Sequence, residues 1–236
     1  MQCDVLADAD AVARRAAAII AEAASDAVRA RGAFVLATSG GTTPWRMLAR
    51  LAELPVPWTR VHLFQVDERV VPPANPERNL RQLRLSLIDR IPLPPGQFHA
   101  MPVDDTDLEA AAARYAVTLE RVAGSPAVLD LVHLGLGADG HTASLVAGDP
   151  ALDVTDRDVA VTGEYQGRRR MTLTFPSIAR ARRILWVMDG VEKAPALARL
   201  RNGDRTIPAG RVPQDRAHVV TDAACVSRSR PDASPT

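Results

Sequence analysis

Residues 129–145 read LDLVHLGLGADGHTASL, a largely apolar run that leads directly into a glycine-rich turn. Such a run is typical of a strand buried on both faces, as in a parallel sheet covered by helices. The turn follows the carboxyl end of this strand, and open α/β sheets bind their ligands at that edge. We therefore expect residues 129–135 to form a buried strand that presents a functional loop.

Strand-like and helix-like stretches alternate on both sides of this segment. Further strands are expected at residues 3–7, 34–38, 61–67, 159–163, 170–175, 183–188 and 217–222, with a short one near 99–103. A helix is expected from Asp8, as its N-cap, to about 30, with Gly32 just past its end, and another from Thr43-Pro44, with Thr43 as N-cap. Further helices are expected at about 79–90, 105–122, 177–181 and 191–201. This alternation predicts an α/β fold with a mostly parallel, Rossmann-like sheet and helices on both faces.

The domain prediction is a single α/β domain over residues 1–226. Residues 148–170 are the least regular part, and we expect them to form either an excursion or a small subdomain over the functional site. The last segment, 227–236, is polar and is predicted to be disordered.

Composition narrows the function classes. The chain has 29 basic and 28 acidic residues, so its charge gives no reason to expect nucleic acid or a membrane surface as partner. Cys3 and Cys225 lie far apart and outside any C-x-x-C, which favours reduced thiols in a cytoplasmic protein. Neither a signal peptide nor a membrane span is evident. The histidines show no metal-ligand spacing, so no metal is expected.

Gly135, Gly137 and Gly140 form a G-x-G-x-x-G, which raises the possibility of a dinucleotide site. That site needs a strand, a full crossover helix and an acidic residue about 20 positions further on. Asp156 and Asp158 lie near that distance, but Gly148-Asp149-Pro150 would limit the helix to one or two turns. The dinucleotide interpretation is therefore disfavoured.

A chemical interpretation centres on His141. We expect a helix to begin at Thr142, and its positive dipole end would disfavour an imidazolium ion. Neutral His141 could take a proton from water, with Asp139 fixing the ring tautomer. Gly137 and Gly140 would let a substrate approach the backbone. The simpler alternative is that His141 only caps the helix.

Two other strand ends carry candidate binding loops. Residues 38–44, TSGGTTP, lack the lysine of a Walker A loop but combine two glycines with a helix start, which suits an anion such as phosphate. An ordinary tight turn is the alternative. The triplet Asp67-Glu68-Arg69 ends the strand at 61–67, where it is either a ligand-binding cluster or a solvated charge run.

Several of these motifs, taken in order, resemble the 6-phosphogluconolactonase family. They are SGGTTP (39–44), DERVVP (67–72) with Asn79, LGLGADGHTASL (134–145), RMTLTF (170–175) and GVEK (190–193). The resemblance implies hydrolysis of 6-phospho-D-glucono-1,5-lactone to 6-phosphogluconate, in the oxidative pentose phosphate pathway, without a cofactor. It also implies an α/β fold shared with glucosamine-6-phosphate deaminases, and we expect a monomer or weak homo-oligomer.

The resemblance also implies roles for individual residues. His141 would be the general base, Asp139 would orient it, and Arg69 would either stabilise developing negative charge or hold the sugar acid. The remaining expected substrate or phosphate contacts are Ser39, Gly40, Gly41, Thr42, Thr43, Asp67, Glu68, Gly137, Gly140, Arg170 and Lys193.

Two other functions stay open from the sequence. A deaminase on the same fold needs a glutamate shortly after the histidine, and no acid occurs between His141 and Asp149. A sugar-phosphate sensor would bind without turnover, but an intact Asp139-Gly-His141 argues against it. The sequence also departs from the family pattern at residues 165–169, YQGRR, where a proline pair is usual.

Overall fold

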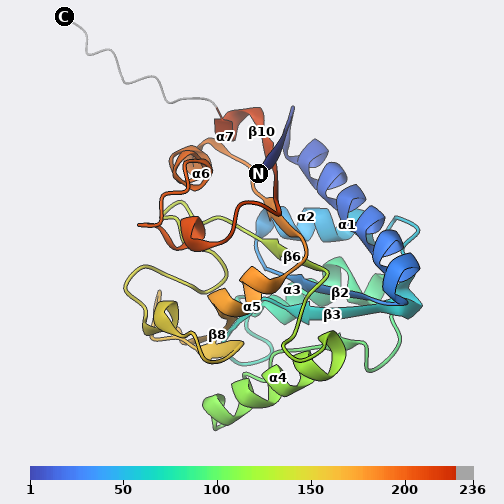
Figure 1. The fold of residues 1–236 in the computed structure, drawn as a ribbon, viewed down its shortest axis with the longest axis vertical. Coiled ribbons are helices and arrows are strands. Elements are labelled where there is room, and N and C mark those ends of the chain that lie inside the picture. Colours follow the sequence, from blue (N-terminus) through green and yellow to red (C-terminus); the bar gives the residue numbers. More distant parts are fainter. Residues whose placement is uncertain (227–236) are drawn as a thin grey trace, which may run out of the picture.

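The structure is a computed structural model that describes residues 1–226, so the predicted disorder of 227–236 lies outside the described residues. Its main sheet has seven parallel strands in the order β1-β10-β9-β6-β2-β3-β5 (Figure 1). The strands are β1 (Gln2–Leu6), β2 (Phe34–Thr38), β3 (Val61–Gln65), β5 (Phe98–His99), β6 (Leu131–Leu134), β9 (Ile184–Val187) and β10 (Ala217–Asp222). The predicted parallel α/β fold is confirmed, with β6 at its centre.

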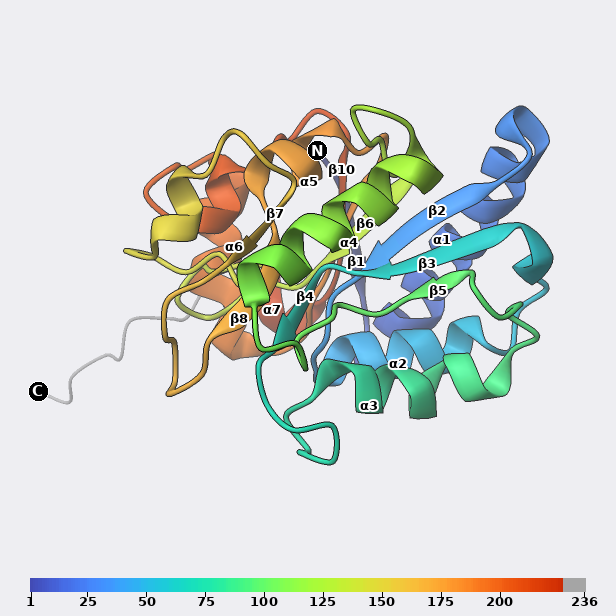
Figure 2. The ribbon, with the colours of Figure 1, turned by 90° about the horizontal axis from the view of Figure 1, so that it is seen from below.

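Helices cover both faces of this sheet, as Figure 2 shows from the side. One face carries α1 (Ala9–Arg31), α2 (Thr42–Leu51) and α3 (Asn79–Ser86), and the other carries α4 (Leu108–Ala123), α5 (Phe175–Arg180), α6 (Ala194–Arg201) and α7 (Ala223–Val226). Alternate strand residues serve the two layers: Leu36 packs toward α1, whereas Val35 and Ala37 pack toward α4. This two-sided burial explains the apolar strands.

Capping residues decide where the helices begin and end. The Asp8 side chain accepts a hydrogen bond from the Ala11 backbone, and Gly32 ends α1 in the left-handed conformation, as predicted. The prediction for α2 was wrong in detail: its first residue is Thr42, its N-cap is Gly41, and no side chain caps it. The Thr43 side chain is engaged elsewhere, as described below.

A second, antiparallel sheet was not predicted as such. It contains β4 (Asp67–Arg69), β8 (Arg170–Leu173) and β7 (Val159–Val161), in the order β4-β8-β7. The expected strand at 61–67 therefore ends at Gln65, and the chain passes through Val66 into a different sheet. The irregular segment 148–170 supplies β7 and the short 3-10 helix Pro150–Asp153. This small sheet shares the apolar core of the main sheet's α4 face, so it is held against the site.

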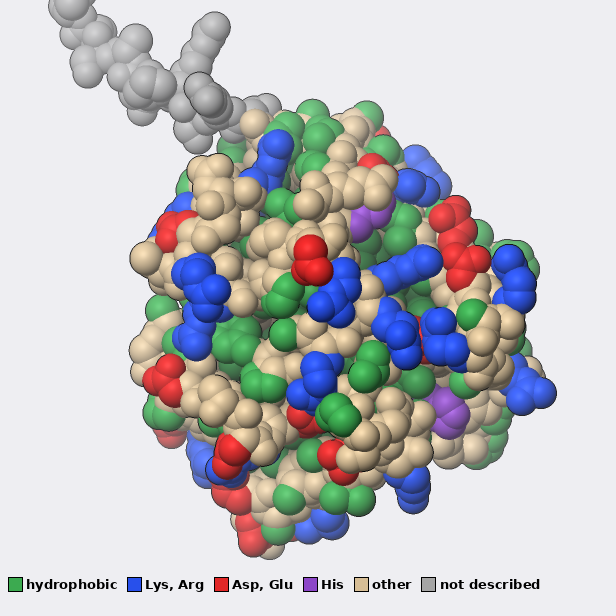
Figure 3. All heavy atoms as spheres, in the orientation of Figure 1, with side chains coloured by type: hydrophobic (Ala, Val, Ile, Leu, Met, Phe, Trp, Pro, Cys, Tyr) green, Lys and Arg blue, Asp and Glu red, His purple; other side chains and the backbone are tan. Residues whose placement is uncertain are grey.

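The remaining short 3-10 helices are Trp58–Arg60, Ile88–Arg90, Val191–Lys193 and Pro208–Arg211. Within residues 1–226, no helix combines the length and apolarity needed to cross a membrane. On the face shown in Figure 3, acidic and basic side chains are interspersed, in keeping with the near balance of charge.

Candidate active site

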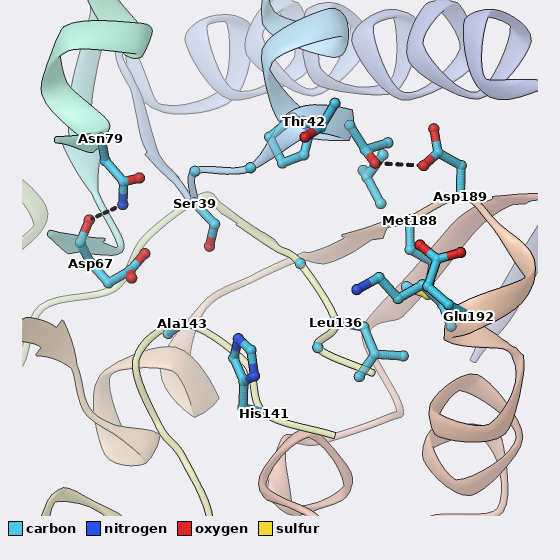
Figure 4. Close-up of a pocket in the computed structure, with 18 of the residues that line it drawn as sticks. Ser39, Thr42, Asp67, Asn79, Leu136, His141, Ala143, Met188, Asp189 and Glu192 are labelled. Atoms are coloured by element: carbon cyan, nitrogen blue, oxygen red, sulfur yellow. Dashed lines mark hydrogen bonds between the residues drawn. The ribbon is translucent and has the colours of Figure 1, made fainter. Parts of the chain in front are cut away.

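A cavity of about 300 Å³ opens at the carboxyl ends of β2, β3, β6 and β9 (Figure 4). It brings together the three loops expected from the sequence, together with the segment that follows β9. Its lining consists of Ser39, Gly40, Gly41, Thr42, Thr43, Pro44, Asp67, Arg69, Asn79, Gly135, Leu136, Gly137, His141, Ala143, Arg170, Val187, Met188, Asp189, Glu192 and Lys193. Of the predicted contacts, Glu68 and Gly140 are not part of this lining.

His141 lies between Leu136 and Ala143, with its imidazole directed into the cavity (Figure 4). Its Nδ1 is 2.6 Å from Asp139 Oδ1, and its backbone N–H donates to the same oxygen at 3.2 Å. A carboxylate can only accept, so the Nδ1 atom carries the proton and the Nε2 atom of the neutral ring is the free base. This is the arrangement expected for a histidine that takes a proton from water.

Asp139 is held as an anion. Partial burial by itself would raise the pKa of this carboxyl. The hydrogen bonds from the His141 backbone, the His141 ring and the Tyr165 hydroxyl together have a larger effect in the other direction, so the pKa lies below its usual value. These hydrogen bonds favour the carboxylate over the carboxylic acid, so Asp139 stays ionised at a pH where the His141 imidazole is neutral.

The helix expected at Thr142 is absent, which corrects the dipole argument for His141. Residues 142–145 instead form a tight turn, with paired backbone hydrogen bonds between Thr142 and Leu145 and a positive φ of 51° at Ala143. Side chains hold this turn: Thr142 donates to the Gly135 carbonyl at 2.9 Å, and Ser144 donates to Asp67 Oδ2 at 2.7 Å. These tertiary bonds replace those a helix would supply, so His141 is not a helix cap.

Two glycines of the turn have steric roles. A Cβ atom on Gly137 would overlap the His141 ring and the Asp139 carboxylate. Gly140 has a φ of +86°, and a Cβ there would lie 2.7 Å from Ile207. Gly137 thus makes room for the His–Asp pair, and Gly140 shapes the turn without reaching the cavity, contrary to its predicted contact with substrate.

Glu68 has a structural position that the sequence did not reveal. It is fully buried and accepts hydrogen bonds from the Gln65 side chain and from the backbone of Arg69, Asn79 and Leu80. Burial raises the pKa of this carboxyl, and those hydrogen bonds oppose that effect. Because the Glu68 oxygens accept the N–H groups at the start of α3 and are buried, they do not reach a substrate, and the expected substrate contact of Glu68 does not hold.

Arg69 and Arg170 stand directly opposite each other in the β4–β8 pair. The Nε atoms of both are buried without a hydrogen-bond partner among residues 1–226. Burial, and then the nearby charge of Arg69, lower the pKa of Arg170. Like charges directly opposite on a sheet are destabilising, and both side chains line the cavity. The pair is therefore a place where an anion would be stabilised.

The loop after β2 and residues after β9 form the other side of the cavity. The Ser39 hydroxyl donates to the His133 carbonyl at 3.1 Å, and the Thr43 hydroxyl donates to Asp189 at 2.9 Å (Figure 4). Those hydroxyl protons are thus already in use. What remains for a ligand is the Thr42 hydroxyl, the unpaired N–H groups of the first turn of α2 and the ammonium of Lys193.

Several lining residues were not predicted as contacts. Asn79 had entered only as part of a motif; its side chain donates to the Asp67 carbonyl at 3.0 Å, and a Cβ on Gly40 would collide with it. Asp189 and Glu192 lie in the segment that follows β9, and only the tertiary structure shows that β9 pairs with β6. Tyr165 is not part of this lining, and the sequence had marked it only as a departure from the family pattern.

A parallel α/β sheet with a His–Asp pair and basic side chains at its carboxyl edge defines a small-molecule enzyme.

Comparisons with known proteins agree with this class. The sequence model of the family described as glucosamine-6-phosphate isomerases/6-phosphogluconolactonase matches residues 7–221. A 6-phosphogluconolactonase of Nostoc sp. is 36% identical over 201 residues, which cover 84% of this chain and 83% of that protein. One of Synechocystis sp. is 37% identical over 203 residues, covering 84% of both. The chain belongs to the glucosamine-6-phosphate isomerase/6-phosphogluconolactonase family.

Solved structures are similar over nearly the whole chain. The 6-phosphogluconolactonase from Thermotoga maritima has a TM-score of 0.81 and 28% identity, covering 94% of this chain and 98% of its own. A monomeric glucosamine-6-phosphate deaminase has a TM-score of 0.79 and 20% identity, covering 95% and 98%. The second likeness is one of fold alone.

Proposed function

We propose that this chain hydrolyses 6-phospho-D-glucono-1,5-lactone to 6-phosphogluconate, with His141 as general base. The observation that carries the proposal is the 2.6 Å contact between His141 Nδ1 and Asp139, which leaves Nε2 free to face the cavity. The similarity to 6-phosphogluconolactonases over 84% of the chain supports the choice of substrate.

In the proposed reaction, His141 Nε2 takes a proton from a water molecule as the water oxygen bonds to the lactone carbonyl carbon. The negative charge that develops on the carbonyl oxygen is stabilised by Arg69. The bond from that carbon to the ring oxygen then breaks, and the proton held by His141 passes to the departing ring oxygen. Asp139 stabilises the imidazolium formed between these steps.

The phosphate is assigned to the side of the cavity formed by the loop after β2 and the residues after β9. There Lys193 supplies charge, and the Thr42 hydroxyl and the N–H groups at residues 40–43 supply hydrogen bonds. Arg170 adds a second charge from β8, next to Arg69. Asp67 keeps one carboxylate oxygen for a sugar hydroxyl, because Ser144 occupies the other. Thr43 contributes through its backbone N–H, whereas the N–H and the hydroxyl of Ser39 are both bound to His133, so Ser39 holds the loop in place.

The direct test generates the lactone with glucose-6-phosphate dehydrogenase and follows its decay with and without the protein. We expect decay well above the spontaneous rate, and a lower kcat/KM for unphosphorylated gluconolactone. Decay at the spontaneous rate would refute the proposed function. Equal kcat/KM for the two lactones would refute the phosphate assignment.

Deaminase activity is the rival on this fold, and we expect none. The nearest acid after His141 is Asp149, whose two oxygens accept hydrogen bonds from the Ala151 and Gly163 backbones, and which does not line the cavity. Ammonia release from glucosamine 6-phosphate is the measurement, and release well above the enzyme-free control would favour the rival.

We also propose that the enzyme acts in the cytoplasm as a monomer or weak homo-oligomer. Both cysteines, Cys3 and Cys225, are free thiols, which suits a reducing compartment. Light scattering after size exclusion measures the oligomeric state directly.

A further inference from the structure

The hairpin between β7 and β8 places a tyrosine on the His–Asp pair. Tyr165 and Arg168 exchange backbone hydrogen bonds of 3.0 and 3.2 Å across a two-residue turn. The turn residues Gln166 and Gly167 have φ values of +54° and +71°, the pattern of a type I′ hairpin turn. This turn fixes the position from which the Tyr165 side chain extends, and it lies in the stretch where the sequence departs from its family.

Tyr165 contacts both members of the His141–Asp139 pair. Its hydroxyl donates to Asp139 Oδ2 at 3.1 Å, whereas His141 uses Oδ1. Its ring meets the His141 ring edge to face, with centroids 5.7 Å apart and planes at 61°. Each carboxylate oxygen therefore has its own donor, and rotation of Asp139 away from His141 would break both bonds.

The same ring also faces the basic side of the cavity. The guanidinium carbon of Arg170 lies 5.0 Å from the centre of the Tyr165 ring, within the range of a cation–π contact. Gln166 bridges the two side chains at 3.4 Å to each. The hydroxyl and the ring of Tyr165 thus touch different parts of the site, and substitutions can separate them.

We propose that Tyr165 is a positioning residue: its hydroxyl fixes Asp139 so that His141 keeps its reactive orientation, and its ring holds Arg170 in place. This rests on the proposed function of His141. By donating to Asp139, the hydroxyl also weakens the negative charge that the imidazolium feels. Removing it strengthens that charge, which favours the protonated ring.

The test compares Tyr165→Phe with Tyr165→Leu in the lactone assay. Loss of the hydroxyl alone should lower kcat about 3- to 10-fold, the effect of one hydrogen bond, with KM little changed. It should also move the acid limb of the kcat/KM profile to higher pH. The leucine variant loses the ring as well and should also raise KM.

Tyr115→Phe is the matched control, because it removes the same atom from a fully buried tyrosine that is not part of the cavity lining. It should lower Tm and leave the acid limb in place.

A double-mutant cycle tells positioning from a merely structural role. In an Asp139→Ala background, Tyr165→Phe should change kcat less than 2-fold, because the hydroxyl acts through Asp139. An equal loss of kcat in both backgrounds would overturn the proposal, as would a Tyr165→Phe variant with the kcat and pH profile of the unmodified protein. Failure of the proposed function is a separate outcome. It would appear as an unmodified protein whose Tm shows that it is folded but in whose presence the lactone decays only at its spontaneous rate.

Discussion

At the scale of single residues, the site depends on a few atoms of Asp139, His141 and Gly137. The short contact to Asp139 determines which nitrogen of His141 carries the proton. The absence of a Cβ on Gly137 lets the ring and the carboxylate meet. These features give two predictions with different physical causes, one chemical and one steric.

His141→Asn removes the proposed base but keeps a side chain of similar size that can hydrogen bond. We expect kcat to fall about 10²- to 10⁴-fold, the usual effect of losing a general base. KM should change little, because the phosphate is bound by other groups. The acid limb of the pH–rate profile reports protonation of the base and should disappear with it. A folded variant that retains most of its kcat would transfer the role to a carboxylate such as Asp67.

Gly137→Ala removes none of the proposed chemical groups, but it displaces two of them. The added methyl overlaps the His141 ring and the Asp139 carboxylate, so the pair must separate. We expect kcat to fall by roughly tenfold or more, since small displacements of catalytic groups are costly. Gly163→Ala is the control, because its nearest neighbour, 3.3 Å away, is an Asp149 side-chain oxygen. Equal activity of both variants would contradict the steric argument.

At the scale of elements, the ends of β3, β4 and α3 form one unit around Glu68. The carboxylate accepts the N–H groups at the start of α3, and Arg78 lies 3.6 Å from it with its own ion pair to Asp104. This unit sets the direction of Asp67 and Arg69, which flank Glu68 and enter the cavity. Glu68 therefore supports the site indirectly, by holding the two residues on either side of it.

Glu68→Gln tests this supporting role. The amide group of glutamine has one acceptor oxygen, and its NH₂ would face backbone donors, so at least one buried N–H group loses its partner. We expect the free energy of unfolding to fall by about 1–3 kcal/mol, measured by denaturant titration. KM should stay near that of the unmodified protein well below Tm. A large rise in KM with unchanged stability would restore the direct substrate contact that the sequence had suggested.

At the scale of the whole molecule, the cavity joins the loops that follow β2, β6 and β9 of one sheet to Asp67, Arg69 and Arg170 of a second sheet. The apolar core on the α4 face is continuous between the two sheets. A ligand that touches both should therefore stabilise the entire fold. The prediction of a single domain over residues 1–226 remains to be tested, and a single unfolding transition would support it.

Binding of 6-phosphogluconate should raise Tm. A ligand at 100 times its Kd contributes about 2.7 kcal/mol. For a chain of this size that corresponds to a rise of roughly 5–10 °C, at about 2–4 °C for each kcal/mol. Differential scanning fluorimetry measures it, with gluconate at the same concentration as the control. A similar rise with gluconate would show that the phosphate contributes little.

Local sequence patterns determined the sheet and much of the site. Apolar runs marked the strands, Asp8 and Gly32 marked the ends of α1, and glycine-rich strand ends located the cavity loops. These signals are readable because backbone geometry and burial act over a few residues. His141, Asp139 and the loop at 39–43 were found in this way.

Only the tertiary structure decided the rest, because it depends on partners distant in sequence. The turn after His141 replaces a helix because Asp67 and Gly135 hold its side chains. Glu68 is buried because α3 brings its N-terminus to it. Tyr165 reaches Asp139 from 26 residues away because β7 and β8 pair. A pattern records the residue types, and folding determines which of them meet.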